Sequence, residues 1–274
     1  MNTAIVDIGS NAIKYKIFND AFELQEYYRH PLRLGRDVFT NGELSDNTEK
    51  QLIELLLNYQ EIFQEKKITD VHFVATSALR DSKNVDALKE KLFNKNIELK
   101  IISGHTEASL LSEFNKDKTN TAVIDIGGGS VEICINSNNN LSFRSFQLGA
   151  VRLLNLSPKD KQAAYEELIN WLSDFKGISH LYGLGGNLRA LMQANSLKGI
   201  LETEKFPLYV KEYLSVSDED LILKFNIPKD RIDIIPEAIT IYQLIIDALE
   251  SEKIENSFWS ISDGLVRKIV TNQL

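Results

Sequence analysis

The sequence contains one cysteine, Cys134, so no disulfide bond can form within the chain. A single thiol favours a reducing, cytoplasmic compartment, because disulfide-stabilised secreted domains carry several cysteines. Long apolar runs are also missing: the stretch 4–6 is too short for a signal peptide, and polar residues interrupt 239–249. The sequence therefore predicts neither a targeting segment nor a membrane span.

Positive charge is in the minority. Lys and Arg total 31 against 39 Asp and Glu, for a net charge of −8. This balance argues against sequence-independent nucleic-acid binding, which needs broad neutralisation of phosphates. A phosphorylated ligand is still possible where a metal ion, helix N-termini or a few basic residues concentrate positive charge. The 274 residues, 43% hydrophobic and 26% charged, are typical of a globular protein of two domains.

The sequence does contain an internal repeat. The segment Ala4–Ile17 returns as Ala122–Ile135. Each copy reads as an apolar strand, an Asp, a turn of small residues and a second strand with apolar residues at alternate positions. That alternation predicts a half-buried β-hairpin in each copy, with Asp7 or Asp125 at the end of its first strand.

Each hairpin turn suits a phosphate ligand. Small residues let several backbone N–H groups point into one concavity that accepts phosphate oxygens. The turn residues are Gly9, Ser10 and Asn11 in the first copy and Gly127, Gly128, Gly129 and Ser130 in the second. The Asp beside each turn offers a hard oxygen ligand for Mg²⁺. An ordinary hairpin connection is the alternative for either turn alone, but repetition with the Asp retained favours the phosphate interpretation.

The remaining pattern predicts two α/β domains. The polar segment 115–120 indicates a boundary, giving domains 1–118 and 119–274, and the last helix could pack back on the first domain. In the first half we expect a hairpin over 4–17, strand material over 22–28, a helix over 47–65, a strand over 71–75, a helix over 85–93, a strand over 98–102 and a helix from 106. In the second half we expect a hairpin over 121–136, strand material over 141–147, helices over 158–175, 188–193, 236–250 and 265–271, and strands over 179–183 and 258–261.

Two strand-to-helix junctions also match each other. The strand 71–75 runs into Thr76 and Ser77, and the strand that ends at Leu184 runs into Gly185, Gly186 and Asn187. A helix start offers free N–H groups and a positive dipole end, which form a second kind of phosphate site. The alternative is that Thr76, Ser77 and Asn187 simply cap their helices.

One carboxylate stands where it could act as a base. If Ser103 is the N-cap of the helix that follows it, Glu107 lies in the first turn, where the helix dipole favours the ionised form. Taken alone, an acidic residue at this position more often only stabilises the helix.

Together these segments resemble the exopolyphosphatase/guanosine pentaphosphate phosphatase family, a branch of the actin, sugar kinase and heat-shock ATPase superfamily. The resemblance covers nearly the whole chain. The matching motifs, in order, are VDIGSN at 6–11, RLG at 33–35, ATSALRDSKN at 75–84, SGHTEA at 103–108, DIGGGSVE at 125–132, LGAVRL at 148–153, GLGGN at 183–187, RIDIIP at 231–236 and ISDGL at 261–265.

The resemblance implies duplicated actin-like (ribonuclease H-like) α/β domains with a cleft between them, and a Mg²⁺-dependent hydrolase. Terminal phosphate would be removed from inorganic polyphosphate or guanosine pentaphosphate. The family's catalytic Glu falls on Glu107 and its metal-binding acidic residue on Asp125, with Glu132 as a second participant. Asp7, beside the first turn, is expected as a further metal ligand. Arg80 becomes a charged clamp that holds substrate phosphates together with the amides of 9–11, 127–130 and 185–187. Relatives are commonly dimers, so a homodimer is a further expectation.

The sequence departs from the family pattern in three places: Asn187 replaces a Thr, Glu237 replaces a Gly, and the stretch 201–230 is shorter than usual. The last two changes predict a reshaped second-domain wall. Without the additional helical domains of longer relatives, we expect short rather than very long polyphosphate as substrate. Two other functions stay open: a superfamily ATPase or sugar kinase, and a non-catalytic sensor that binds polyphosphate or an alarmone.

Overall fold

The computed structural model describes residues 2–270. Contacts divide the chain into two compact units: the first runs to Glu107 and resumes at Ile261, and the second spans Ala108–Ser260. The predicted boundary at 118/119 falls inside the second unit of this division. The polar segment around it is part of a folded core, because Asn115 is fully buried and its amide donates to the carbonyl oxygen of Cys134 at 3.0 Å.

The first unit is built on a five-stranded sheet with the order β3-β2-β1-β4-β5. Its strands are β1 (Thr3–Ile8), β2 (Ile13–Phe18), β3 (Leu24–His30), β4 (Asp70–Ala75) and β5 (Leu99–Ile101). The first three strands form an antiparallel meander, and β4 and β5 run parallel to β1. Its helices are α1 (Leu34–Asn41), α2 (Asp46–Glu65), α3 (Ser77–Asp81), α4 (Val85–Phe93), α5 (Gly104–Leu110), which extends past the division, and α13 (Ile261–Val270).

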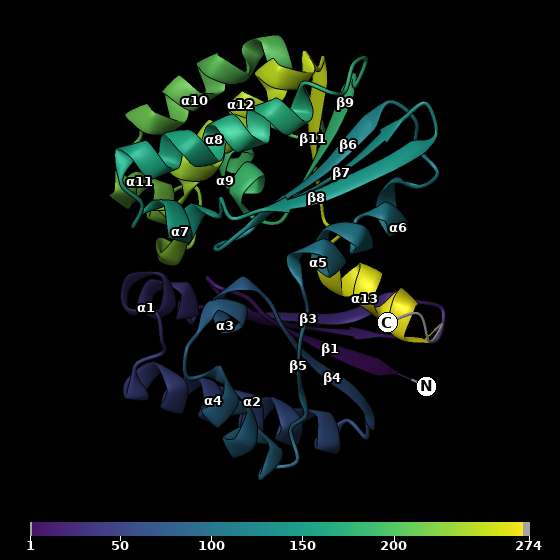
Figure 1. Cartoon of the computed structure of the whole chain (residues 1–274), viewed down its shortest axis with the longest axis vertical. Coiled ribbons are helices and arrows are strands. Elements are labelled where there is room, and N and C mark those ends of the chain that lie inside the picture. The colour runs from purple at the N-terminus through teal and green to yellow at the C-terminus, as the bar shows by residue number, and fades with distance from the viewer. Residues whose placement is uncertain (1, 271–274) are drawn as a thin grey trace. The chain divides into compact units, whose positions relative to one another are not determined.

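Alternation along β1 determines how these helices cover the sheet. Ala4, Val6 and Ile8 point into a core that the apolar side of α2 completes, for example through Leu52 and Leu56. The N-cap of α2 is Ser45, whose hydroxyl accepts a hydrogen bond from the Thr48 amide. α13 packs on the other side of β1, where Asp263 binds the buried Lys16 of β2 at 2.5 Å. Figure 1 shows α2 and α4 on one side of this sheet and α13 on the other.

The second unit repeats the same plan with one strand more. Its sheet has the order β10-β11-β9-β6-β7-β8. The strands are β6 (Thr121–Ile126), β7 (Val131–Ser137), β8 (Asn140–Phe146), β9 (His180–Leu184), β10 (Ile200–Glu202) and β11 (Lys253–Ser257). Its helices are α6 (Ser112–Asn115), α7 (Ala150–Leu153), α8 (Pro158–Leu172), α9 (Asn187–Ala194), α10 (Phe206–Ser215), α11 (Asp218–Leu223) and α12 (Ile235–Leu249), with 3-10 turns η1 (Thr203–Lys205) and η2 (Lys229–Arg231).

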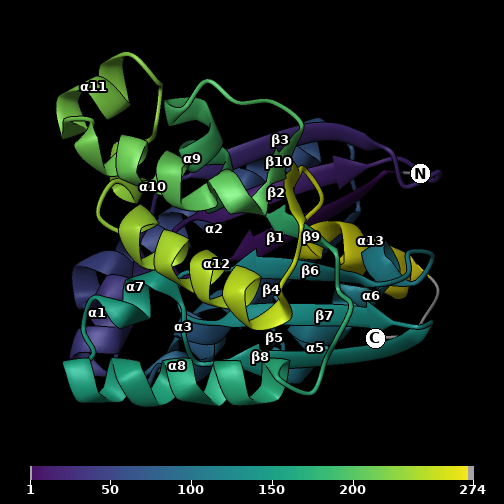
Figure 2. The same ribbon diagram turned by 90° about the horizontal axis from the view of Figure 1, so that it is seen from above.

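The duplication extends to strand register. Ala4 pairs with Ile17 across β1 and β2, and Ala122 pairs with Ile135 across β6 and β7. The strands β9 and β11 stand beside β6 as β4 and β5 stand beside β1, all of them parallel. α8 and α12 lie across one face of the second sheet (Figure 2). The predicted duplicated α/β fold is therefore confirmed.

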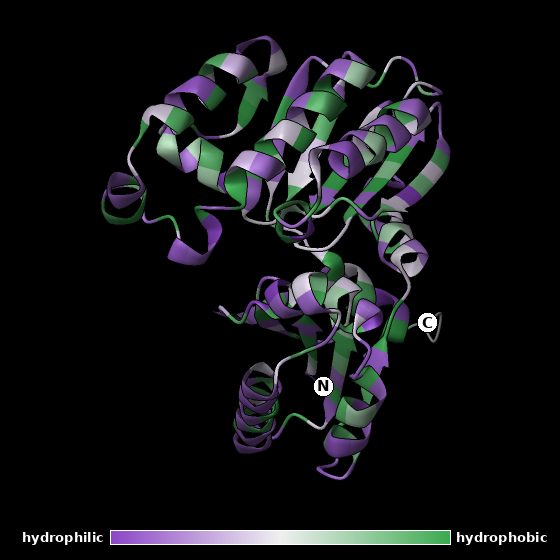
Figure 3. Cartoon of the chain, turned by 60° about the vertical axis from the view of Figure 1, so that its left-hand side comes forward, coloured by the Kyte–Doolittle hydropathy of each residue, from purple (hydrophilic) through white to green (hydrophobic). Residues whose placement is uncertain are grey.

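Hydropathy follows this layering. Figure 3 shows hydrophobic residues along the strands of each sheet and alternating hydrophilic and hydrophobic residues along the helices. α12 is the most apolar of the long helices, and its buried residues include Ile241, Tyr242 and Ile245. None of the helices in the described range combines the length and the apolar character that a membrane crossing requires.

Several predicted bounds are wrong. The last strand is β11 at Lys253–Ser257 rather than 258–261, because a largely polar strand with one fully buried residue, Ile254, gives no clear alternation. The last helix begins at Ile261 rather than 265, and the predicted end at 271 lies outside the described residues. The helix α1 was not expected, because its second residue, Gly35, weakens the helical pattern; an added Cβ there would lie 3.0 Å from the Cβ of Ser10.

Candidate functional site

The first hairpin turn is held from three sides within the first unit. The carbonyl oxygen of Ser10 accepts a hydrogen bond from the Gly35 amide at 2.8 Å, and the Gly9 amide donates to the carbonyl oxygen of Ala12 at 3.2 Å. The buried Ser10 hydroxyl lies 2.9 Å from that of Ser77 at the start of α3. The Asn11 side-chain oxygen accepts from Arg33 at 2.9 Å. The predicted turn 9–11 and the predicted helix start at 76–77 are thus brought together.

Asp7 has a cation beside it. It is buried at the end of β1, and its register partner across the hairpin is Lys14. The Lys14 ammonium lies 3.2 Å from Asp7 Oδ2. The negative charge of Asp7 is therefore offset by the neighbouring Lys14 ammonium.

Glu107 and Arg80, predicted as base and clamp, contact each other. Ser103 begins α5 as expected, since its hydroxyl accepts a hydrogen bond from the Thr106 amide at 3.0 Å. Glu107 lies in the first turn and is only 2% exposed. Its Oε1 accepts from Arg80 Nη1 at 2.6 Å, and the same nitrogen donates to the carbonyl oxygen of Ile102 at 2.9 Å. The guanidinium and the helix first turn both favour a negative charge at this position, which offsets the cost of burying it.

In the second unit, α7 fixes the glycine turn. The carbonyl oxygen of Gly127 accepts from the Ala150 amide, and that of Gly128 accepts from the amides of Val151 and Arg152, at 2.8–3.0 Å. The N–H of a trans peptide points opposite to its C=O. The amides of Gly128 and Gly129 are therefore directed away from α7, as an anion-binding turn requires.

The close approach of α7 depends on a glycine. A Cβ added at Gly149 would lie 2.3 Å from the backbone of Gly129. Arg152 Nε also donates to the carbonyl oxygen of Gly129 at 2.6 Å, which brings a guanidinium next to the turn. The second turn is therefore more tightly constrained than its sequence suggests.

Asp125 and Glu132 form a pair of carboxylates. They are register partners across β6 and β7, so their side chains leave the same face, with about 5 Å between the Cβ atoms of such a pair. Glu132 is 1% exposed, and its Oε1 accepts from the Ser145 hydroxyl at 2.8 Å. Burial and, secondarily, Asp125 raise the pKa of Tyr242, so this phenol stays neutral.

The third predicted loop joins the second turn through Asn187. Its amide nitrogen donates to the carbonyl oxygen of Ile126 at 2.9 Å, and its oxygen accepts from Arg231 Nη1 at 3.0 Å. Gly185 has φ +78°, and a Cβ added at Gly186 would lie 2.4 Å from Arg231 Cζ. Ile126 ends the strand that carries Asp125, so the loop 185–187 lies beside the start of the turn 127–130.

The capping alternative for the two junctions is wrong. The N-cap residues are Thr76 for α3 and Gly186 for α9, and neither makes a side-chain cap hydrogen bond. The side chains of Ser77 and Asn187 instead bind Ser10 and Ile126, in the neighbouring turns. Both junctions therefore make tertiary contacts to the two hairpin turns or to the strand end beside them.

Sequence reasoning missed four cations at these turns: Lys14, Arg33, Arg152 and Arg231. Arg33, Arg152 and Arg231 stand in the motifs RLG, LGAVRL and RIDIIP, but nothing in the spacing showed that they contact the turns. Lys14 could have been found, because it occupies in the first copy of the repeat the position of Glu132 in the second.

Glu237, where the family has Gly, faces α8. Its carboxylate accepts from Lys161 at 2.5 Å and from the Tyr165 hydroxyl at 3.4 Å. Burial raises the pKa of Tyr165 to about 12, with the nearby Glu237 as a further cause. The departure from the family pattern thus ties the start of α12 to α8.

No three His, Cys, Asp or Glu side chains within residues 2–270 cluster closely enough to hold a metal ion by themselves. Mg²⁺ does not need such a cluster, because it normally binds one or two carboxylates, waters and substrate phosphates. The paired oxygens of Asp125 and Glu132 fit that requirement. The predicted third ligand, Asp7, belongs to the first unit and is paired with Lys14.

The model of the Ppx/GppA phosphatase family matches residues 28–273, so the chain belongs to this family. The structure is similar to that of an exopolyphosphatase from Cytophaga hutchinsonii, with a TM-score of 0.86 at 19% identity over 99% of this chain and 98% of that one. The Aquifex aeolicus member of the Ppx/GppA family gives a TM-score of 0.76 at 21% identity, covering 100% and 98% of the two chains. The duplicated actin-like fold implied by the motifs is confirmed.

Among curated proteins, the chain is 28% identical over 262 residues to the bifunctional 3-dehydroquinate synthase/phosphatase of Fusobacterium nucleatum. It is 23% identical over 296 residues to the guanosine-5'-triphosphate,3'-diphosphate pyrophosphatase of Aeromonas hydrophila. These alignments cover 84% and 98% of this chain, which spans 39% and 59% of the two relatives' lengths.

Proposed function

We propose that the chain is a phosphohydrolase that releases the terminal phosphate of a phosphoanhydride chain, either short inorganic polyphosphate or guanosine pentaphosphate. Membership of the phosphatase family supports the reaction class. The single observation that carries the mechanism is the buried Glu107 carboxylate, held against a guanidinium in the first turn of α5. In this proposal Glu107 accepts the proton of the attacking water as a general base.

The chemical step is a displacement by water. The water oxygen forms a bond to the terminal phosphorus while its proton passes to Glu107. The bridging P–O bond breaks, and its electron pair leaves with the shortened chain. Phosphoryl transfer needs mainly positioning and neutralisation of charge, and each unit offers turn amides with cations beside them for this purpose.

Asp125 and Glu132 would hold Mg²⁺ in this proposal. When bound, the ion neutralises charge on the substrate's phosphate oxygens. We assign the ion to these two residues because the Lys14 ammonium already offsets the charge of Asp7. Within the first unit, the turn 9–11 offers amides beside Lys14; within the second unit, the turn 127–130 offers amides beside the two carboxylates.

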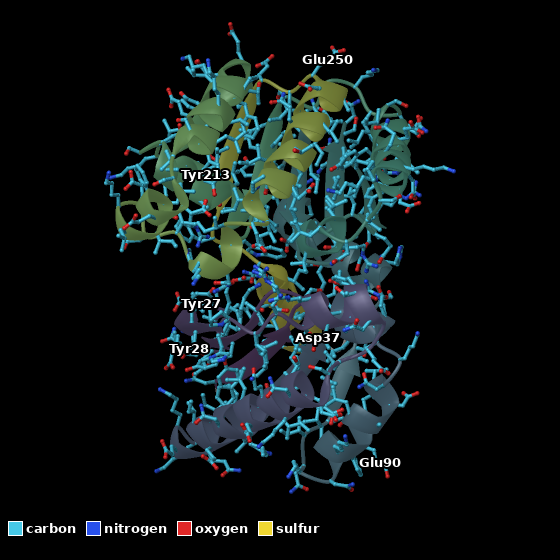
Figure 4. All side chains as sticks on the ribbon, turned by 90° about the vertical axis from the view of Figure 1, so that its left-hand side faces the viewer. Tyr27, Tyr28, Asp37, Glu90, Tyr213 and Glu250 are labelled. Atoms are coloured by element: carbon cyan, nitrogen blue, oxygen red, sulfur yellow. The ribbon has the colours of Figure 1, made fainter. Side chains whose placement is uncertain are left out.

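The test is phosphate release with Mg²⁺ from short polyphosphate, long polyphosphate, guanosine pentaphosphate and ATP in parallel. Glu107→Gln keeps the side chain's shape and its acceptor for Arg80, and we expect it to lower kcat by ~10²–10⁴. The matched control is Glu90→Gln on the exposed side of α4 (Figure 4), which should leave kcat unchanged. Binding without release from any substrate would contradict hydrolysis and favour a sensor, and release from ATP alone would favour a superfamily ATPase.

A further inference from the structure

The two terminal nitrogens of the Arg80 guanidinium have different surroundings. Nη1 donates to Glu107 Oε1 at 2.6 Å and to the carbonyl oxygen of Ile102 at 2.9 Å. Nη2 is buried and has no hydrogen-bond partner among the described residues. Because a guanidinium is planar and its five donors point in fixed directions, binding two acceptors through Nη1 also fixes the direction of Nη2.

The helix that carries Arg80 contacts the first hairpin turn, residues 9–11. α3 begins at Ser77, whose hydroxyl contacts that of Ser10 in the turn at 2.9 Å. Arg80 follows three residues later, on the same side of the helix as Ser77. The Arg80 amide donates to the carbonyl oxygen of Thr76 at 3.0 Å, so the helical turn between them is closed. α3 therefore contacts the turn 9–11 through Ser77 and contacts Glu107 through the guanidinium of Arg80.

A buried donor without an acceptor is unfavourable and rare in folded proteins. At Nη2 the missing acceptor is most simply an anionic oxygen, because guanidinium nitrogens bind phosphate and carboxylate oxygens in parallel pairs. The pair with Glu107 meanwhile removes the freedom of that carboxylate to rotate. One guanidinium can therefore bind Glu107 through Nη1 and an anion through Nη2, and its planar shape would fix the two relative to each other.

We propose that Arg80 is a positioning residue for Glu107, which orients the carboxylate through Nη1 while Nη2 binds an oxygen of the terminal phosphate. This inference rests on the proposed hydrolytic function and goes beyond a simple charged clamp. A clamp contributes to substrate binding, whereas a positioning residue acts on the rate of the chemical step and only when the base is present.

The test is a double-mutant cycle in phosphate release, with wild type, Glu107→Gln, Arg80→Gln and the double variant. We expect Arg80→Gln to lower kcat by ~10²–10⁴, as loss of a general base does, with a change in KM of less than about tenfold. In the Glu107→Gln background the same substitution should cost less than about threefold in kcat, because residues that act as one unit are not additive. The matched control is Arg267→Gln, an exposed arginine of α13 in the same unit, which should change neither constant.

Two further measurements test the proposal even if Arg80→Gln fails to fold. Arg80→Lys retains the charge but has a single nitrogen, so it should stay folded by circular dichroism while recovering less than about a tenth of wild-type kcat. Added guanidinium should raise the kcat of Arg80→Ala at least about tenfold, and added ammonium should not. A rise in KM at unchanged kcat, or multiplicative losses in the double variant, would overturn the positioning role. A wild-type protein that releases no phosphate from any substrate would instead overturn the proposed function.

Discussion

Substituting Glu132 by Gln should have opposite effects on the stability of the metal-free protein and on its response to Mg²⁺. Asp125 and Glu132 are cross-strand partners, with about 5 Å between the Cβ atoms of such a pair. At an effective dielectric constant of about 20, two like charges at that distance repel by about 3 kcal/mol. Glu132→Gln removes one of these charges and keeps the oxygen that accepts from Ser145.

We therefore expect Glu132→Gln to stabilise the metal-free protein by about 1–3 kcal/mol, or about 2–10 °C in Tm for a unit of this size. The same change removes a carboxylate ligand, so the increase in Tm that Mg²⁺ produces in wild type should shrink or vanish. Thermal unfolding with EDTA and with Mg²⁺ measures both effects. Glu166→Gln, on an exposed position of α8, is the matched control. A Glu132→Gln protein that is less stable without metal and fully responsive to Mg²⁺ would refute the reasoning.

Three other substitutions test separate parts of the structure. Gly149→Ala forces a methyl group to within 2.3 Å of the Gly129 backbone, so phosphate release should fall at least about tenfold while circular dichroism shows a folded protein. Ser103→Ala removes the hydroxyl that caps α5 and should cost about 1 kcal/mol in urea unfolding, with a smaller loss for Ser103→Asn. Burial lowers the pKa of His180, so the folded state resists protonation and stability should fall as pH drops below about 6.5; His180→Gln should weaken that fall, and identical pH profiles would contradict it.

Repetition made the fold predictable. The hairpins 4–17 and 121–136 were visible because strand alternation and small-residue turns recur in register, and both occur as predicted. Long helices with a clear apolar stripe, such as α2 and α12, were also placed to within a few residues. The helices α10 and α11 were not expected, because both are short and α10 carries exposed apolar residues such as Leu208 and Leu214.

The contacts of the candidate site were less predictable than its residues. Sequence reasoning selected Arg80 and Glu107 separately, and only the structure shows that they share a hydrogen bond of 2.6 Å. The same holds for Asn187, whose contact with the carbonyl oxygen of Ile126 joins segments far apart in the chain. A sequence reports residue types and local spacing, whereas a pair of this kind depends on how strands and helices pack.

The two copies of the hairpin have diverged in charge rather than in shape. Both place an Asp at the same register position, but its partner is the basic Lys14 in the first copy and the acidic Glu132 in the second. A lysine beside Asp7 supplies a fixed positive charge, whereas two carboxylates lower their mutual repulsion by sharing a cation. One duplicated element can thus supply a fixed cation in one unit and a metal site in the other. This division explains why we assign Mg²⁺ to Asp125 and Glu132 and not to all three acidic residues.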